Sequence, residues 1–572
     1  MITILPQLDD NPWFQEEISI SPDASVGLLK RRVEEALREC LQLHAVRDEN
    51  ASPEAVAVQP LGLMLSPSGF PLDERASVRG SGLLNRDTVT CLVQTTVNSG
   101  IFGNVCLDRF SNTGLEVQHV FSTKFAFAAL RRDGSVICWG QPFCGGDCFG
   151  VQEQLNAGVL RVFSTHSAFA ALRIGGQLVT WGRPDFGGNC SAVSHMLQDG
   201  VQQVYSTHSA FAALKESGSV VAWGRPEFGG DCAFVEPQLR RDVRIIFSND
   251  RAFAAVKTQG HVVSWGQADA GGNFSSPTAQ QIDVEHIYAT NYAFAAVSRD
   301  GSVVTWGHPE YGGDSSYVRR ELAKDVRYVC AGGRAFAAIK LKGAVVSWGH
   351  EKYGGDSSIV EDLLQDGVEN VYATQSAFAA LKSDRSVVTW GDADSGGDSN
   401  AVRKQLSADV FRIYCTDSAF AAVKERGTLV TWGYAKDGGD SSEVAEQLRT
   451  SPWRVQVVYS TSSSFTALLE NGSIVSWGTH EAETESVEEL RENSDIRRVF
   501  TTSNAWAALK HDGSVDTWGC SFQGGDSGAV WRQLSGGPAA SSKYAGFRER
   551  CCCSLPAAAR PPTPSGAGCL IS

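Results

Sequence analysis

The sequence lacks a long hydrophobic run and an excess of positive charge. No stretch of about 18 apolar residues occurs, so we expect no transmembrane helix. Residues 1–10 contain acidic side chains and no basic one, so we also expect no signal peptide. The formal net charge of -14 argues against nucleic acid as a partner, because broad electrostatic binding to phosphates requires a basic surface.

Signatures of common catalytic sites are also missing. We find no Gly-rich phosphate loop, His-Glu-x-x-His motif, nucleophile elbow or set of kinase motifs. His166 and His208 recur within Ser-Thr-His-Ser, but Asn291, Gln375 and Asp417 stand at comparable positions, so we interpret the histidines as exposed loop residues. The sequence therefore predicts a protein that is not an enzyme, with no cofactor and no identified small-molecule substrate. A hydrolase or transferase with an unrecognised site is the alternative.

Fifteen cysteines are present, but their placement argues against a disulfide framework. Cys148, Cys190 and Cys232 occupy one repeated position, which serine takes in later repeats. Cys138, Cys144 and Cys148 form a C-x5-C-x3-C group whose spacing does not match the usual zinc motifs. We therefore expect no bound metal and a reducing, cytosolic setting.

The dominant feature of the chain is a Trp-Gly pair that recurs ten times. The intervals between successive tryptophans are 41, 42 or 45 residues. A fixed period of this size marks an array of supersecondary units, and such arrays usually provide binding surfaces. We expect the tryptophans to form the structural core of the repeats. They are Trp139, Trp181, Trp223, Trp265, Trp306, Trp348, Trp390, Trp432, Trp477 and Trp518.

The repeat at residues 284–322 shows how one unit is built. Its apolar pattern predicts strands at 284–290, 293–298 and 302–307. Asp-Gly between the second and third segments predicts a tight hairpin turn, because this turn requires positive φ. A Gly-Gly-Asp loop follows, and we expect Asp314 or the next serines to cap a short helix that extends through Leu322.

Neighbouring units must pack against one another. A single unit contains too few large apolar residues to offset the entropy lost when it becomes ordered. One repeated position holds phenylalanine in nine units and Trp506 in the tenth. We expect the array to be least regular after Trp477, where residues 479–485 replace the Gly-Gly-Asp loop, and at Asp384-Arg385, where the turn glycine is missing.

The pattern Ala-Phe-Ala-Ala-Leu-Lys-x-x-Gly-Ser-Val-Val-x-Trp-Gly resembles the repeats of the regulator of chromosome condensation family and of β-lactamase inhibitor protein II. The resemblance implies a mainly β, β-propeller-like array of ten repeats at residues 117–534. Members of this fold act as nucleotide-exchange factors, chromatin binders, ubiquitin-ligase modules and protein inhibitors. The units here are shorter than in the family, and Gly-Gly-Asp replaces its Gly-Gln-Leu-Gly. Whether ten units close into one ring, split or stay open is undecided at this point.

Residues 1–97 lack the repeat, and a linker at 98–116 connects them to the array. The predicted elements are strands at 1–5 and 17–21, an amphipathic helix at 25–37, and strands at 63–72 and 87–93. This order of hairpin, helix, strand and strand is similar to that of a ubiquitin-like (β-grasp) domain of the α+β class.

The resemblance to ubiquitin-like domains implies a partner-binding apolar patch. By alignment the patch falls on Met64, Thr90 and Leu92, with Thr90 in place of the usual histidine. The alternative is that Met64 and Leu92 are ordinary strand residues. No Gly-Gly follows Val93, so we expect a fixed module and not a conjugated modifier.

Residues 535–572 form a tail that we expect to be disordered. The chain ends in Cys-Leu-Ile-Ser, which matches the C-a-a-X prenylation motif of the farnesyl type at Cys569. One lipid chain binds membranes only marginally. Palmitate on Cys551, Cys552 and Cys553 would supply the second signal. The alternative is a tail whose cysteines carry no lipid.

These features together predict a non-catalytic protein–protein interaction scaffold or adaptor in the cytoplasm, held at a membrane through its tail. The expected partners are proteins, with ubiquitin-pathway components as candidates. Loops between the units, such as Pro226–Phe228 and Pro309–Tyr311, are the expected contacts. The alternative is a guanine-nucleotide exchange factor or chromatin-associated regulator of the chromosome condensation regulator type.

Overall fold

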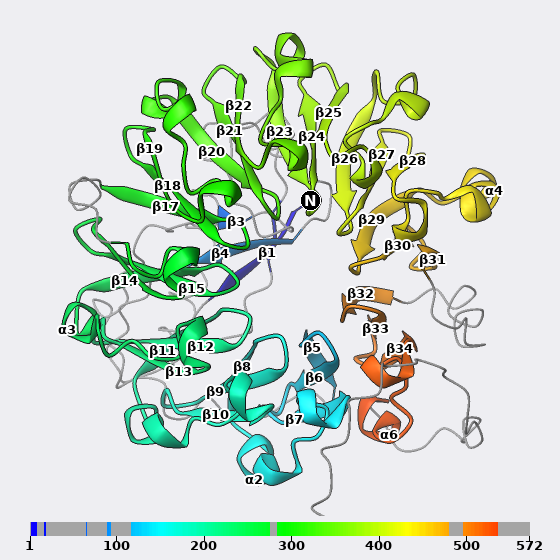
Figure 1. The fold of residues 1–572 in the computed structure, drawn as a ribbon. Coiled ribbons are helices and arrows are strands. Elements are labelled where there is room, and N and C mark those ends of the chain that lie inside the picture. The colour runs from blue at the N-terminus through cyan, green and yellow to red at the C-terminus, as the bar shows by residue number, and fades with distance from the viewer. Residues whose placement is uncertain are drawn as a thin grey trace, which may run out of the picture.

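The chain folds into ten blades that are arranged in one ring. A computed structural model describes residues 116–274, 283–479 and 496–535, together with the backbone of four strands between residues 2 and 92. The three ranges form ten three-stranded antiparallel sheets, one for each Trp-Gly repeat, in a β-propeller-type arrangement (Figure 1). The mainly β fold class that the repeats predict is confirmed.

In each blade the chain passes from an inner strand to a middle strand and then to an outer strand (Figure 1). The inner strands are β5 (Val117–Ser122), β8 (Val159–Ser164), β11 (Val201–Ser206), β14 (Val243–Ser248), β17 (Val284–Ala289), β20 (Val326–Ala331), β23 (Val368–Ala373), β26 (Val410–Cys415), β29 (Val455–Ser460) and β32 (Ile496–Thr501). The middle strands are β6 (Ala126–Arg131), β9 (Ala168–Arg173), β12 (Ala210–Lys215), β15 (Ala252–Lys257), β18 (Ala293–Ser298), β21 (Ala335–Lys340), β24 (Ala377–Lys382), β27 (Ala419–Lys424), β30 (Ser464–Leu469) and β33 (Ala505–Lys510). The outer strands are β7 (Val136–Gly140), β10 (Leu178–Gly182), β13 (Val220–Gly224), β16 (Val262–Gly266), β19 (Val303–Gly307), β22 (Val345–Gly349), β25 (Val387–Gly391), β28 (Leu429–Gly433), β31 (Ile474–Gly478) and β34 (Val515–Gly519).

Short helical segments connect the blades. The 3-10 turns directly after the outer strands are η1 (Pro142–Cys144), η3 (Pro184–Phe186), η5 (Pro226–Phe228), η6 (Ala268–Ala270), η8 (Pro309–Tyr311), η11 (Glu351–Tyr353), η13 (Ala393–Ser395), η15 (Ala435–Asp437) and η16 (Ser521–Gln523). Further along each connection lie η2 (Phe149–Val151), η4 (Ser191–Met196), η9 (Ser316–Val318), η10 (Glu321–Ala323), η12 (Ser358–Leu363), η14 (Asn400–Val402), α2 (Gln152–Leu155), α3 (Glu236–Leu239), α4 (Ser442–Thr450) and α6 (Trp531–Leu534). Within the described ranges, no helix has the length and apolar character needed to cross a bilayer.

The blade at residues 284–323 has the three strands that its sequence predicts, but its helix differs. The connection forms two 3-10 turns, η9 and η10, instead of one short α-helix. Asp314 Oδ1 accepts the backbone N–H of Ser316 at 2.9 Å, so it caps a turn. Leu322 is the only fully buried side chain of this connection. So short a segment with one apolar anchor cannot sustain an α-helix, because helix nucleation is costly.

The turn at Asp384-Arg385 is regular, so the expectation of irregularity there is wrong. Strands β24 and β25 pair in the same antiparallel register as in other blades. Arg385 adopts φ +68°, which takes the place of the missing glycine. Asp384 Oδ1 accepts the N–H of Ser386 at 2.9 Å and its hydroxyl at 2.6 Å. These hydrogen bonds offset the strain of a left-handed arginine, which is about 1–2 kcal/mol.

The ten blades close into one ring because the tenth blade packs on the first. The Nε1–H of Trp139 in the first blade donates to the carbonyl of Gly524 in the tenth at 3.0 Å. The backbone N–H of Val117 donates to Gly513 O, also at 3.0 Å. One buried cluster joins the two blades and includes Phe127 and Leu509.

One contact between neighbouring blades repeats around the ring. At eight junctions the first glycine of the Gly-Gly loop has positive φ, and its carbonyl accepts the indole N–H of the next blade, as Gly312 O does from Trp348 at 3.0 Å. The phenylalanine of the next blade packs against the same glycine: a Cβ on Gly312 would lie 2.5 Å from Phe336 Cδ2. Eight indoles make this bond, those of Trp139, Trp181, Trp223, Trp265, Trp348, Trp390, Trp432 and Trp477.

Two seams between blades depart from this pattern. Neither Trp306 nor Trp518 has a hydrogen-bond partner for its indole N–H among the described residues. Trp306 instead stacks on Phe274, with ring centroids 4.3 Å apart. The loop that replaces Gly-Gly-Asp after Trp477 lies largely outside the described residues. An irregular seam between the fourth and fifth blades was not expected from the sequence.

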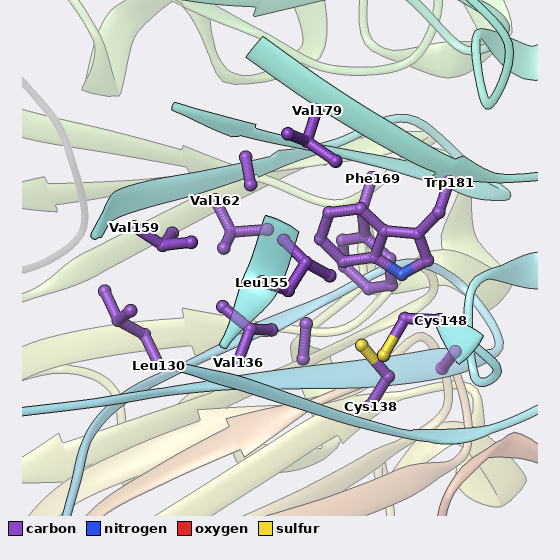
Figure 2. Packing of buried hydrophobic residues seen from close by; sticks show 13 residues of the cluster. Leu130, Val136, Cys138, Cys148, Leu155, Val159, Val162, Phe169, Val179 and Trp181 are labelled. Carbon is purple, nitrogen blue, oxygen red and sulfur yellow. The ribbon is translucent and has the colours of Figure 1, made fainter. Parts of the chain in front are cut away.

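A hydrophobic core lies between each pair of blades. Figure 2 shows the core between the first and second blades, where Leu155 and Phe169 are fully buried beside Trp181. The sulfur atoms of Cys138 and Cys148 point toward one another in the same core (Figure 2). Complete burial of a side chain such as leucine or phenylalanine stabilises the fold by about 1.5–3 kcal/mol. Each such core contains residues of two neighbouring blades, so the blades depend on one another for burial.

Four strands of the N-terminal part form a separate sheet. They are β1 (Ile2–Gln7), β2 (Glu16–Ile18), β3 (Met64–Leu65) and β4 (Thr88–Leu92), in the order β2-β1-β4-β3. The strands β1 and β4 are parallel, and the other pairs are antiparallel. The helix predicted at 25–37 lies outside the described residues.

We expect Gly312→Ala to destabilise the ring more than Gly175→Ala does. Both glycines have similar positive φ, +91° and +86°, so alanine suffers the same backbone strain of about 1–2 kcal/mol at each. Only at Gly312 does the new Cβ collide with a neighbour, while at Gly175 no atom lies within 4 Å. The collision adds about 1–3 kcal/mol. Urea denaturation measures the free energy of unfolding of both variants. Equal decreases in this free energy would contradict the proposed packing.

Candidate functional site

One face of the ring is formed by two sets of loops. The loop between the inner and middle strands meets the 3-10 turn that follows the outer strand. Thr165 Oγ1 donates to the carbonyl of Phe186 at 2.9 Å, and Arg183 N donates to Ser167 O at 3.0 Å. We call this surface the mouth face. The hairpin turns between middle and outer strands lie at the opposite end of each blade.

Backbone hydrogen bonds join the inner loops of the mouth face into a chain around the ring. In most blades, the second residue after the inner strand donates its backbone N–H to the backbone carbonyl of the equivalent residue in the next blade. The bonds run from Lys124 to His166, His166 to His208, His208 to Asp250, Asn291 to Gly333, Gly333 to Gln375, Gln375 to Asp417, Asp417 to Ser462 and Ser503 to Lys124, at 2.9–3.2 Å. Among the described residues, the chain is interrupted at the same two seams where the indole bond is missing. The repeat therefore fixes the backbone of the mouth and leaves its side chains free to differ.

A cavity of about 550 Å³ opens at the mouth. Loops of the first blade and of the fifth to tenth blades line it. Their side chains are methyl groups, hydroxyls, amides, the Cys415 thiol, one carboxylate and one ammonium group. Lys124 supplies the ammonium group and Asp417 the carboxylate. Asn291 Nδ2 donates to Gln375 Oε1 at 3.4 Å. Asp417 is hydrogen-bonded to Gln375 and Ser462, and burial raises the pKa of its carboxyl.

His166 and His208 are half-buried and stacked, which differs from the expectation of exposed loop residues. Their ring centroids lie 4.2 Å apart, and their Nδ1 atoms lie 2.8 and 2.7 Å from the hydroxyls of Ser167 and Ser209. Burial, aided by the charges of His208, Lys124 and Arg183, lowers the pKa of His166 to about 4. Burial also lowers the pKa of His208. Both rings are therefore neutral at pH 7 and present aromatic faces, not charges, on the mouth face.

Aromatic rings and guanidinium groups form a continuous row on the mouth face over the third to sixth blades. We call this row the arc. Its members, in order of contact, are Phe228, Arg251, Tyr292, Tyr311, Arg334 and Tyr353. The loops Pro226–Phe228 and Pro309–Tyr311, expected as contacts, contribute one ring each.

Sequence reasoning missed the two arginines of the arc. Arg251 and Arg334 occupy a position that holds serine in five other blades. The signal was present as a departure from the repeat at one fixed position. It could be interpreted only after the structure showed that this position lies beside the 3-10 turns of the mouth face.

The other predicted site residues lie elsewhere. Met64 pairs with Cys91 and Leu65 with Thr90 between β3 and β4, and their side chains lie outside the described structure. The partner-binding patch therefore stays a prediction. The candidate lipidation sites Cys551, Cys552, Cys553 and Cys569 also lie outside the described residues. All ten repeat tryptophans are buried between blades, away from solvent.

The Cys138–Cys148 group lies in the core between the first and second blades. Burial raises the pKa of the Cys138 thiol well above its usual value. In the described part of the chain, no group of three His, Cys, Asp or Glu side chains is arranged to hold a metal ion.

Comparisons with known proteins identify loosely similar folds only. No protein-family model and no curated protein matches the sequence. Solved structures that align with it include yeast RCC1 (Prp20) bound to Kap60, at 14% identity and a TM-score of 0.30, covering 68% of this chain and 98% of that chain. Prp20p of Saccharomyces cerevisiae aligns at 17% identity and a TM-score of 0.26, covering 40% and 71%. The computationally designed Ika8 protein aligns at 12% identity and a TM-score of 0.28, covering 64% and 96%. Alignments at this level carry no conclusion about activity or partners.

We expect the ring to lose stability as the pH falls from about 6.5 toward 4, in part through His166. In this window the unfolded chain binds a proton at His166 that the folded chain does not bind, so protonation favours unfolding. His166→Asn should weaken this dependence, because Asn291 occupies the same position in the fifth blade. Melting temperatures of both proteins at pH 7.5 and pH 5 test this. Equal decreases in the two proteins would show that His166 is not involved.

Proposed function

We propose that the protein is a non-catalytic scaffold that binds partner proteins across the mouth face. The observation that carries this proposal is the contrast between a fixed backbone and variable side chains at the mouth. The chain of inner-loop hydrogen bonds repeats in eight junctions, whereas the residues that make it include lysine, histidine, aspartate, asparagine, glycine, glutamine and serine. A rigid frame that presents different side chains is suited to specific recognition, because little ordering entropy is lost on binding.

The polar lining of the mouth cavity also supports binding over catalysis. Most of its groups are hydroxyls and amides, such as Asn291 and Gln375, which donate and accept hydrogen bonds. The carboxylate of Asp417 is hydrogen-bonded to Gln375 and Ser462. A serine nucleophile is usually activated by a histidine, and none stands among the described residues that line the cavity. We therefore keep the proposal that the protein is not an enzyme.

We further propose that the N-terminal part is a ubiquitin-like module that recruits a second partner. The strand order β2-β1-β4-β3, with a parallel pair in its centre, supports this proposal. The candidate contact residues are Met64, Thr90 and Leu92. Ubiquitin-pathway proteins that co-purify with the full chain, and not with a chain lacking residues 1–97, would support the module; identical partner lists would exclude it.

Membrane attachment through the tail is a separate proposal that rests on the Cys-Leu-Ile-Ser terminus. Farnesylation at Cys569 adds a defined mass to the C-terminal peptide. Mass spectrometry of that peptide from the native cell decides the question, since an unmodified peptide would exclude the anchor.

The alternative of nucleotide exchange or chromatin binding rests on the resemblance of the repeats alone. Acceleration of nucleotide release from a panel of small GTPases by the purified protein would favour it over the scaffold.

Substitutions on the mouth face should remove partners that substitutions on the opposite face retain. The test variant Lys124→Glu/Asp417→Lys changes two residues that line the mouth cavity. The control Lys342→Glu/Glu425→Lys changes two exposed residues in hairpin turns at the opposite end, with the same zero change in net charge. Affinity purification with quantitative mass spectrometry compares each variant with the unaltered protein. Loss of the same partners from both variants, or from neither, would contradict the assignment of the mouth face.

A further inference from the structure

The arc is a preorganised row of alternating rings and cations. The Cζ atom of Arg251 lies 4.9 Å from the ring centroids of both Phe228 and Tyr292. The Cζ atom of Arg334 lies 5.2 Å from the centroid of Tyr311 and 4.8 Å from that of Tyr353. Each guanidinium is thus held between two aromatic rings. Such contacts fix the plane of the side chain before any partner arrives.

Both guanidinium groups retain unused donors. Arg251 donates one N–H to Gln267 Oε1 at 3.0 Å, and a guanidinium has five N–H donors in all. Within the described ranges, no carboxylate lies within ion-pair distance of Arg251 or Arg334. Other mouth-face arginines differ, since Arg183 pairs with Asp185 at 2.9 Å and Arg225 with Glu227 at 3.4 Å. The charge of Arg251 acts on the neighbouring Asp250, but within the described ranges neither arginine of the arc forms an ion pair.

Two histidines beside the arc also have an unused polar atom. The Nδ1 atoms of His308 and His350 are buried and have no hydrogen-bond partner among the described residues. The His308 ring lies 5.0 Å from Tyr311 and the His350 ring 4.5 Å from Tyr353, measured between centroids. A buried polar atom without a partner destabilises a fold by about 1–3 kcal/mol unless something satisfies it.

The next sector of the mouth face lacks arginine. In the seventh and eighth blades, the same loops and turns carry Asp392, Asp394, Asp417 and Asp437, with Lys436 as their one cation. Over the third to sixth blades these loops and turns also carry acids, which are Glu227, Asp250, Asp269, Glu310 and Glu351, but the cations Arg225, Arg251, Arg334 and Lys352 lie among them. Guanidinium donors for an acidic ligand are therefore present over the arc and absent from the seventh and eighth blades, which sets the position of such a ligand around the ring.

We propose that the arc binds an extended acidic peptide segment of a partner protein. Carboxylates of the peptide accept paired N–H bonds from Arg251 and Arg334, a geometry that guanidinium groups favour. Apolar or aromatic side chains of the peptide pack on Tyr292 and Tyr311 between the two arginines. Nucleic acid is the weaker fit, because every nucleotide carries a negative charge that the net charge of -14 opposes, whereas a peptide can carry its acids only where Arg251 and Arg334 lie. The inference rests on the proposed scaffold function and specifies one of its ligands.

Fluorescence anisotropy with the full-length protein tests this proposal. The probe is a fluorescein-labelled twelve-residue peptide of alternating acidic residues and tyrosine, compared with a peptide in which Gln and Asn replace Glu and Asp. We expect the acidic peptide to bind about tenfold more tightly or better, and Arg251→Gln/Arg334→Gln to lose about tenfold or more in affinity. Arg251→Lys/Arg334→Lys should give an intermediate affinity, because lysine keeps the charge and loses the planar pair of donors.

The matched control is Arg240→Gln/Arg449→Gln. It removes two positive charges from exposed connections between blades, where these arginines pair with Glu236 and Glu446. Its affinity for the acidic peptide should stay within about twofold of the unaltered protein, since screening weakens distant surface charges. If the control variant loses as much affinity as the arc variant, the effect comes from net charge alone, and the proposal is overturned. Arg334→Gln alone is the second test variant, because no hydrogen bond joins this side chain to another described residue, so that its loss should not disturb folding.

Two further outcomes overturn the proposal. One is equal binding of the acidic and amide peptides. The other is tighter binding of a single-stranded oligouridine that the arc variant also loses, which would make the ligand a nucleic acid. If the acidic peptide does not bind while Lys124→Glu/Asp417→Lys still removes cellular partners, the arc assignment fails and the scaffold proposal stands. If the acidic peptide does not bind and the mouth-face variant also keeps all its cellular partners, both proposals fail.

Discussion

The structure depends on one contact between neighbouring blades, in which a tryptophan indole N–H meets a glycine carbonyl. A single blade has little independent stability, because a unit of about 40 residues buries too small a fraction of its surface. The Gly-Gly loop supplies a carbonyl to the next tryptophan and a surface without a side chain to the next phenylalanine, as Gly187 does for Trp223 and Phe211. Each blade therefore completes the core of its neighbour, and the same contact between Gly524 and Trp139 closes the ring.

This arrangement separates the residues that build the ring from those that distinguish one blade from another. Glycine, tryptophan and phenylalanine are fixed by packing, while the inner loops and 3-10 turns of the mouth face are held by backbone bonds and tolerate any side chain. The result is a face with a row of aromatic rings and arginines over the third to sixth blades, and with four aspartates and no arginine over the seventh and eighth. Such asymmetry on a regular frame suits the proposed recognition of a particular partner.

Much of the fold follows from the sequence, because each blade obeys local rules. The period of the tryptophans, the Asp-Gly turns and the alternation at Val284–Ala289 predict the strands that are observed. Ring closure could not be predicted, since it depends on small angles between blades that accumulate around the ring. The regular turn at Arg385 was missed because hydrogen bonds from Asp384 compensate for the absent glycine. The arc was missed because Arg251 and Arg334 lie far apart in sequence from the rings that hold them.

The most direct test of the central contact compares two tryptophans. Trp223→Phe removes the hydrogen bond to Gly187 O, at 3.0 Å, whereas Trp306→Phe removes an N–H that has no partner in the described structure. The two substitutions otherwise delete the same atoms from similarly buried positions. We expect Trp223→Phe to lower the free energy of unfolding by about 1–3 kcal/mol more, because it leaves a buried carbonyl unpaired. Equal losses in the two variants would contradict the view that the indole hydrogen bonds hold the blades together.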